Sequence, residues 1–164
     1  MKHGKFKHVD PDVFHGRELS LHDCIADQIV FEDNTLRFFM PDGIWVTQRH
    51  PGNDSQKVVR TDAAAVSFYV EELDDIILRV FTRNKWCWAG KTIVEIWEMD
   101  RLIACVNSGK CILEFITQYR TYGEQMWHCA IRSNRKPYYR ECQIYLPGTD
   151  ATYYWNDICP DREW

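Results

Sequence analysis

Residues 111–146 decide the fold, and they read CILEFITQYRTYGEQMWHCAIRSNRKPYYRECQIYL. Apolar and polar side chains alternate in three stretches, Cys111–Tyr119, Gln125–Arg132 and Pro137–Leu146. This period of two is typical of a β-strand with two unlike faces. The joints, Tyr122-Gly123-Glu124 and Ser133-Asn134-Arg135-Lys136, are short and polar. The stretch therefore predicts three consecutive antiparallel strands.

Strand patterns continue on both sides of this stretch. Towards the N-terminus, Pro41-Asp42-Gly43 is a turn, because Pro presets φ, Asp bonds the local backbone and Gly accepts a positive φ. Together with a second turn at Glu32-Asp33-Asn34, it predicts a three-stranded meander over His22–Phe31, Thr35–Met40 and Ile44–Thr47. Further strands are predicted where β-branched and aromatic residues gather: Val66–Val70, Ile76–Thr82, Thr92–Trp97 and Thr152–Trp155.

One segment departs from this period. Met99, Leu102, Ile103 and Val106 follow the i, i+3, i+4, i+7 spacing of an amphipathic helix. Glu98 and Asp100 suit the positive N-terminus of such a helix, and Asn107-Ser108-Gly109 supplies a stop signal. We expect one short helix at about residues 98–108.

The fold class follows from these elements. With about nine or ten strands, one helix and no alternation of strand and helix, we expect a mainly β protein, an antiparallel β-sandwich or partly open barrel. The basic, histidine-rich residues 1–20 are expected to form a loosely ordered arm, and residues 21–164 a single β-rich domain.

Composition excludes several classes of protein. The chain has 164 residues, with 20 Lys and Arg against 24 Asp and Glu, so its charge of −4 does not favour a nucleic-acid binder. The longest apolar stretch, Ala63–Val70, is much shorter than the ~20 residues that cross a bilayer, so no membrane association is expected. The N-terminus has no apolar signal region, which favours a cytoplasmic location.

The seven cysteines are expected to be free thiols. Their number is odd and no two have the C-x-x-C spacing of redox or zinc motifs. His128 and Cys129 are neighbours on a predicted strand, so their side chains point to opposite faces and do not form a nucleophile–base pair. The chain also lacks a P-loop and the common dinucleotide, hydrolase and metal motifs. We expect no cofactor and no metal.

Three carboxylates sit among apolar residues on predicted strands: Glu95, Glu114 and Glu141. If their faces converge, two of them could act as a general acid and base, as in a glycosidase. The alternative is that each lies on a solvated face, or that Glu114 pairs with an arginine such as Arg79, Arg132 or Arg140.

Two further groups suggest a binding surface. Trp86 and Trp88 flank a cysteine in a predicted loop, where indoles can stack on sugars or anchor a protein partner, or simply cap the core. Arg132, Arg135, Lys136 and Arg140 form a basic cluster that suggests electrostatic steering of a partner, or a solvated hairpin tip.

The segment from Leu21-His22-Asp23-Cys24 through Pro41-Asp42-Gly43, together with Asn107-Ser108-Gly109-Lys110, resembles small uncharacterised proteins of Firmicutes-type bacteria. That family implies no activity and no site residues. The small, acidic, aromatic-rich composition is also similar to that of immunity proteins that neutralise bacterial toxins.

Three functional hypotheses remain open. The first is a non-enzymatic protein-interaction module of the toxin-immunity type, with Trp86, Trp88, Arg135 and Lys136 at its surface. The second is a small-ligand or carbohydrate-binding β-domain that uses polar strand residues, namely Glu95, Glu114, Gln118 and His128. The third is a hydrolase with paired carboxylates. The sequence favours the first and leaves the oligomeric state open.

Overall fold

The computed structural model describes residues 6–12, 17–83 and 92–164. The segment around residues 111–146 forms the longest strands of the protein, β11 (Cys111–Arg120), β12 (Glu124–Ser133) and β13 (Tyr139–Pro147). They pair antiparallel in chain order, with Cys129 of β12 opposite both Phe115 of β11 and Cys142 of β13. The three predicted strands are confirmed.

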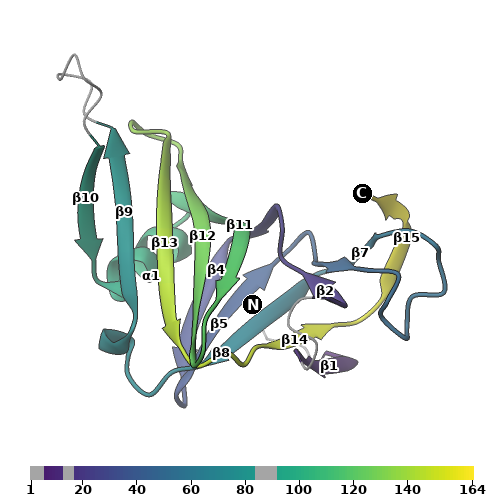
Figure 1. Cartoon of the computed structure of the whole chain (residues 1–164). Coiled ribbons are helices and arrows are strands. Elements are labelled where there is room, and N and C mark those ends of the chain that lie inside the picture. The colour runs from purple at the N-terminus through teal and green to yellow at the C-terminus, as the bar shows by residue number, and fades with distance from the viewer. Residues whose placement is uncertain (1–5, 13–16, 84–91) are drawn as a thin grey trace.

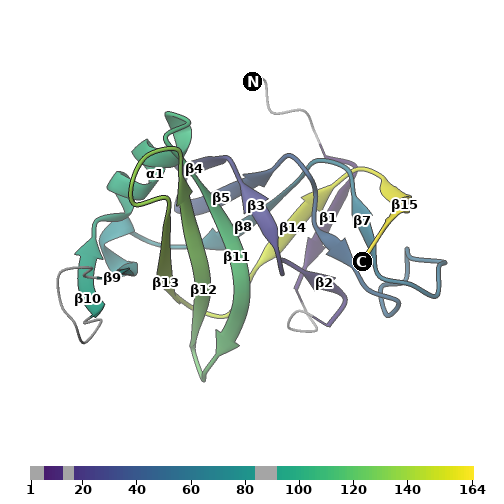
Figure 2. The same ribbon diagram turned by 90° about the horizontal axis from the view of Figure 1, so that it is seen from above.

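These strands form the centre of a six-stranded sheet with the order β10-β9-β13-β12-β11-β3 (Figure 1). The added strands are β3 (Cys24–Ala26), β9 (Ile77–Arg83) and β10 (Thr92–Trp97). Strand β10 lies at one end of the molecule and forms an edge of the sheet (Figures 1 and 2).

A five-stranded sheet with the order β1-β14-β8-β5-β4 packs beside the six-stranded one. Its strands are β1 (His8–Pro11), β4 (Gln28–Glu32), β5 (Thr35–Met40), β8 (Ala64–Tyr69) and β14 (Thr152–Trp155). Aromatic rings join the two sheets. Phe115 packs edge-on against Phe38 with ring centroids 5.3 Å apart, and Trp127 packs against Phe68 at 6.1 Å.

A small third sheet has the order β15-β7-β6-β2. Its strands are β2 (Leu19–Ser20), β6 (Trp45–Val46), β7 (Val59–Thr61) and β15 (Ile158–Glu163). It lies at the end of the molecule away from β10, together with the C-terminus (Figure 1). Within the expected N-terminal arm, His8–Pro11 and Leu19–Ser20 therefore take part in sheets.

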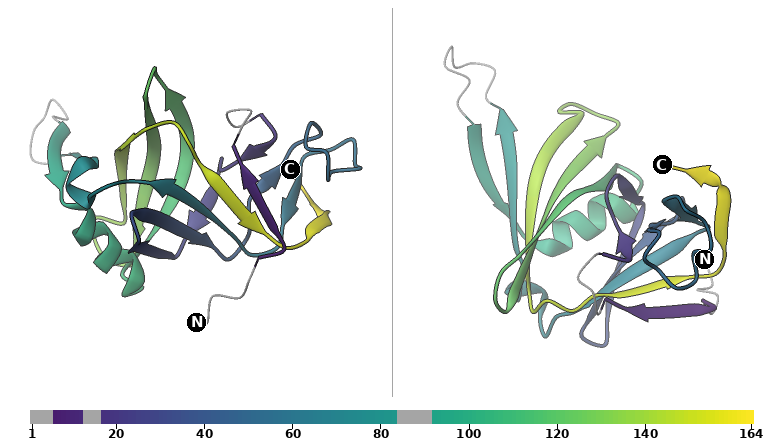
Figure 3. Two further views of the ribbon diagram at one scale, coloured as in Figure 1. Left: turned by 90° about the horizontal axis from the view of Figure 1, so that it is seen from below. Right: turned by 45° about the vertical axis from the view of Figure 1, so that its right-hand side comes forward.

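The predicted helix is confirmed as α1 (Met99–Asn107). Met99, Leu102 and Val106 are buried and Ile103 is partly buried, as the helical spacing predicts. Helix α1 covers the inner face of the six-stranded sheet and also contacts β4 (Figure 3, right). The sheet face turned away from α1, which faces the viewer in Figure 1, is called the outer face below. Among the described residues, no helix has the length and apolar character needed to span a bilayer.

The fold class is confirmed: the described part of the chain is mainly β, antiparallel, with one short α-helix and no closed barrel. It contains 15 strands, more than the nine or ten expected, because several are only two or three residues long. Such strands are too short to show a period in the sequence.

The predicted meander over residues 22–47 is wrong in two places. Residues 22–31 divide between β3 in the six-stranded sheet and β4 in the five-stranded sheet. Beyond the predicted turn, β6 does not return along β5 but pairs with β7 and β2. Gly43 directs this exit, because its φ is +80° and a Cβ there would lie 2.2 Å from the carbonyl oxygen of Asp62.

Candidate functional site

The structure brings part of the predicted site together on the six-stranded sheet. Glu114 and His128 both lie on its outer face, and Arg135 and Lys136 are exposed in the turn between β12 and β13. Glu95 lies on the opposite, inner face. Trp86 and Trp88 lie outside the described residues.

The register of the strands defines the outer face. One row of directly opposite residues crosses five strands: Glu114, Ala130, Glu141, Phe81 and Val94. The next row consists of Thr117, His128, Gln143, Arg79 and Ile96. Side chains that are directly opposite in an antiparallel sheet share one face, so these rows form one continuous surface.

Glu114 is fixed in this surface by Arg132. The guanidinium donates two hydrogen bonds, from Nε to Oε2 at 2.6 Å and from Nη2 to Oε1 at 2.8 Å. The Glu114 side chain is 11% exposed whereas that of Arg132 is 52% exposed. Arg132 therefore neutralises a nearly buried carboxylate while keeping much of its own surface accessible, in the bidentate geometry typical of strong arginine pairs.

A second polar group lies beside it. His128 Nε2 lies 3.5 Å from Glu141 Oε2, and the Tyr145 hydroxyl donates to Gln143 Oε1 at 2.9 Å. Arg79 stacks over the Tyr145 ring at 4.9 Å from its centroid. These contacts fix the direction of most polar side chains on the face without burying them.

Exposed apolar and aromatic side chains complete the outer face. On this side of the sheet, the large apolar residues that face solvent are Ile77, Val94, Ile96, Tyr119 and Tyr139. Desolvation raises the pKa of the Tyr139 phenol, and the carboxylates of Glu141 and Glu114 raise it further, against a lowering by Arg132. Tyr139 thus stands in the electrostatic field of both acidic groups as a neutral hydrogen-bonding group.

Basic side chains gather at one end of this face. Lys110, Arg135 and Lys136 are exposed around the β12–β13 turn, next to Arg132. The backbone N–H of Asn134 in this turn donates to the carbonyl of Lys110, which holds the turn against the start of β11. Within the described ranges, none of these three cations forms an ion pair with a carboxylate.

Glu95 has a different role on the inner face. Its Oε2 accepts a hydrogen bond of 2.9 Å from the indole Nε1 of Trp97. The guanidinium of Arg101 lies 3.7 Å from the Trp97 ring centroid, on the helix side. Glu95 and Glu114 are thus separated by the thickness of the sheet, so these two carboxylates do not form an acid–base pair.

The thiols lie away from the outer face. Cys129 is fully buried while its neighbour His128 is on the outer face, which confirms their predicted separation. Burial raises the pKa of the Cys24 thiol to about 11, and also raises the pKa of Cys111 and Cys129. The six described cysteines are free, but thiols in this environment are poor nucleophiles.

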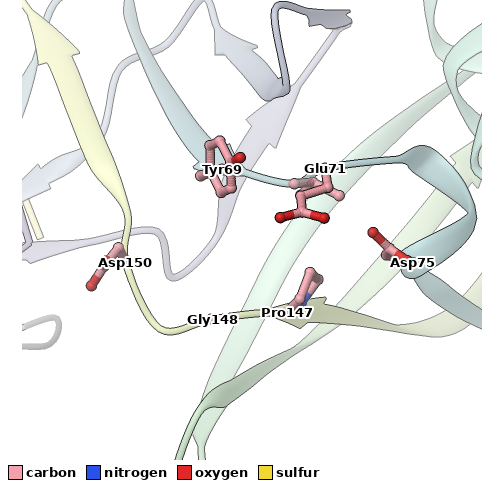
Figure 4. A pocket seen from close by; sticks show the side chains of 7 residues that line it. Tyr69, Glu71, Asp75, Pro147, Gly148 and Asp150 are labelled. Atoms are coloured by element: carbon pink, nitrogen blue, oxygen red, sulfur yellow. The ribbon is translucent and has the colours of Figure 1, made fainter.

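Several pockets lie outside the outer face or at its border, and two of them adjoin strands of the six-stranded sheet. One, of about 290 Å³, lies between the segment after β8 and the β13–β14 turn, where Glu71 and Asp75 lie across from Pro147 (Figure 4). In the part of the chain that the structure describes, no three His, Cys, Asp or Glu side chains are placed to hold a metal.

The other pocket, of about 310 Å³, borders the outer face where β11 has an irregular register between Phe115 and Thr117. His22 Nδ1 contacts the carbonyl oxygen of Ile116 at 2.5 Å. The residues that line it are Ser20, Leu21, His22, Ile116, Thr117, Gln118 and Trp127.

No family model, curated protein or solved structure matches the chain. The site therefore rests on its own geometry.

Proposed function

We propose that the protein is a non-enzymatic protein-interaction domain and that the outer face of the six-stranded sheet is its binding surface. The observation that carries this proposal is the combination of exposed aromatic and apolar side chains with fixed charges on long, rigid strands. Aromatic residues and arginine are enriched in protein interfaces, where they supply most of the binding energy. Tyr139, Arg132 and Arg79 have this character.

The charges on this face favour an acidic partner. The Glu114 carboxylate is already neutralised by Arg132, and Lys110, Arg135 and Lys136 stand at the basic end. An acidic surface would complement them and be steered towards them during association. A toxin neutralised by this domain, as in the immunity-protein hypothesis, would accordingly present carboxylates to it. We place the domain in the cytoplasm, which the free, buried thiols support.

The experiment starts with affinity purification of the full chain and of the double variant Arg135→Glu/Lys136→Glu. The partner recovered with the unmodified chain is then purified and its dissociation constant measured at increasing salt concentration. We expect the double variant to bind about tenfold more weakly and to lose part of the salt dependence, because rim charges act mainly through steering. A partner that binds both proteins equally, with the same salt dependence, would contradict the proposal.

A second candidate function is binding of a small polar ligand in the pocket beside β11. The observation that favours it is that polar side chains from β11 (Thr117 and Gln118) and from the turn before β3 (His22) line a hollow of about 310 Å³ with Trp127 at its wall. That volume is at the lower end of ligand sites, which suits a monosaccharide-sized molecule. Titration with monosaccharides, followed by NMR, should shift the Trp127 indole resonance, and Thr117→Leu should abolish the shift.

A further inference from the structure

The edge strand β10 has an open hydrogen-bonding side. All six of its residues pair with β9 on one side, in an unbroken register from Thr92 opposite Arg83 to Trp97 opposite Leu78. On the other side, no strand or side chain among the described residues bonds to its backbone. Backbone groups on such an edge are a template for another strand.

The edge of the neighbouring sheet shows how this fold protects an edge elsewhere. Strand β4 is the last strand of the five-stranded sheet, and α1 lies against it. Both amide atoms of the Asn107 side chain bond the Ile29 backbone, since Oδ1 accepts from its N–H and Nδ2 donates to its carbonyl, each at 2.8 Å. The side chain of Asn107 thus occupies the place of a strand residue.

Strand β10 has none of these protections. It contains no Pro, no Lys and no bulge, three of the usual devices that prevent edge pairing, and its one charged side chain, that of Glu95, points inward and accepts a hydrogen bond from the Trp97 indole. Apolar side chains are exposed on both of its faces: Ile93 is 43% exposed on one, and Val94 and Ile96 are 52% and 64% exposed on the other. An exposed apolar edge of this kind is a site where pairing with another strand is expected.

We propose that this edge pairs antiparallel with β10 of a second copy of the chain, which makes the protein a homodimer. In such a dimer a two-fold axis relates the two strands. Because directly opposite side chains in an antiparallel pair share a face, one residue of β10 must lie opposite its own copy across this axis. In the register centred on Val94, this residue lies opposite Val94 of the partner subunit, and Ile96 lies opposite Thr92 of the partner subunit.

The single charged residue of the strand selects this register. Centring the pair on Glu95 would place two carboxylates directly opposite each other, which is destabilising. In the register centred on Val94, Glu95 instead lies opposite an isoleucine and keeps its hydrogen bond to the Trp97 indole. Only the registers centred on Val94 and on Glu95 bring five of the six residues of β10 opposite each other, so the one centred on Val94 is the longest pairing without this repulsion.

The dimer has a consequence for the whole surface. An axis perpendicular to the sheet joins the two six-stranded sheets into one, with both outer faces on the same side. Although Val94 and Ile96 also belong to the outer face, the inference concerns backbone pairing at the edge and is tested by the mass of the chain, so it stands independently of the function proposed above.

Sedimentation equilibrium over a range of concentrations tests the dimer. We expect the unmodified chain to reach twice its mass of 19.5 kDa. Val94→Lys and Val94→Glu, each alone, should sediment as monomers, because each places like charges directly opposite across the axis. An equimolar mixture of the two variants should again form dimers, because residue 94 then faces an opposite charge.

Ile77→Lys is the matched control, since Ile77 is exposed to a similar degree on the same face but lies on β9, inside the sheet. It should remain a dimer. Circular dichroism establishes that each variant is folded. A monomeric unmodified chain, a Val94→Lys variant that still dimerises, or a mixture that stays monomeric would each overturn the inference.

Discussion

At the scale of single residues, the outer face depends on how Glu114 is neutralised. The sequence shows a carboxylate between two isoleucines and offers three arginines as partners. The strand register determines which arginine pairs with Glu114. Arg132 lies on β12 in the row next to that of Glu114, and its guanidinium group reaches both carboxylate oxygens. Such a pairing between residues 18 positions apart cannot be identified without the register.

Arg132→Ala is expected to destabilise the fold. The substitution leaves the Glu114 carboxylate nearly buried and without its two hydrogen bonds. We expect the free energy of unfolding to fall by about 1–3 kcal/mol, after allowance for the partial exposure of Arg132. Urea unfolding at pH 7 measures it. The double variant Arg132→Ala/Glu114→Gln should recover part of the loss, because the unpaired charge is gone. Equal stability of Arg132→Ala and the unmodified protein would contradict this role.

Burial of the Cys24 thiol predicts a loss of stability at alkaline pH. Its pKa rises from 9.0 to about 11 on folding, so the folded state holds a proton that the unfolded state releases. The stabilisation is complete below pH 9 and disappears as the pH rises through about 11. Urea unfolding at intervals from pH 8 to 11 should show this decline. In Cys24→Ala the free energy of unfolding should decline less steeply with pH. The same slope in the variant and the unmodified protein would contradict the role given to the Cys24 thiol.

At the scale of secondary-structure elements, long periodic segments are predictable and short ones are not. The strands β11 to β13 and helix α1 each repeat their pattern several times, so the sequence predicts them closely. The two-residue strands β2 and β6 are defined by pairing, because β2 pairs with β6 and β6 also pairs with β7. Tertiary pairing, and not local pattern, specifies such strands.

The buried face of α1 gives a prediction at this scale. Leu102 is fully buried against the inner face of the sheet, so Leu102→Ala should cost about 2–5 kcal/mol. Ala104→Gln is the control on the exposed side of the same helix and should change stability by less than about 0.5 kcal/mol. Denaturant unfolding compares the two. A loss below about 1 kcal/mol for Leu102→Ala would show that the helix does not pack as described.

At the scale of the whole molecule, the binding surface is a product of sheet order. Glu114 and His128 stand out in the sequence because each interrupts an apolar strand pattern, and the structure places both on the outer face. From the sequence, Arg79 is only a possible partner of Glu114, and Tyr139 and Ile96 are not candidates for a site; the three come from separate strands. Their shared face follows only from strand order, although the spacing of Tyr139 and Glu141 already put those two together.

The most direct test of the binding surface compares two exposed tyrosines on different sheets. Tyr139 is 51% exposed on the outer face, whereas Tyr69 is 64% exposed on the five-stranded sheet. Calorimetric titration with the purified partner should show that Tyr139→Ala weakens binding about tenfold or more, since truncated interface aromatics typically cost over 1 kcal/mol. Tyr69→Ala should change the dissociation constant less than about twofold. Full affinity of Tyr139→Ala, or a larger loss from Tyr69→Ala, would contradict the assignment of the outer face as the binding surface.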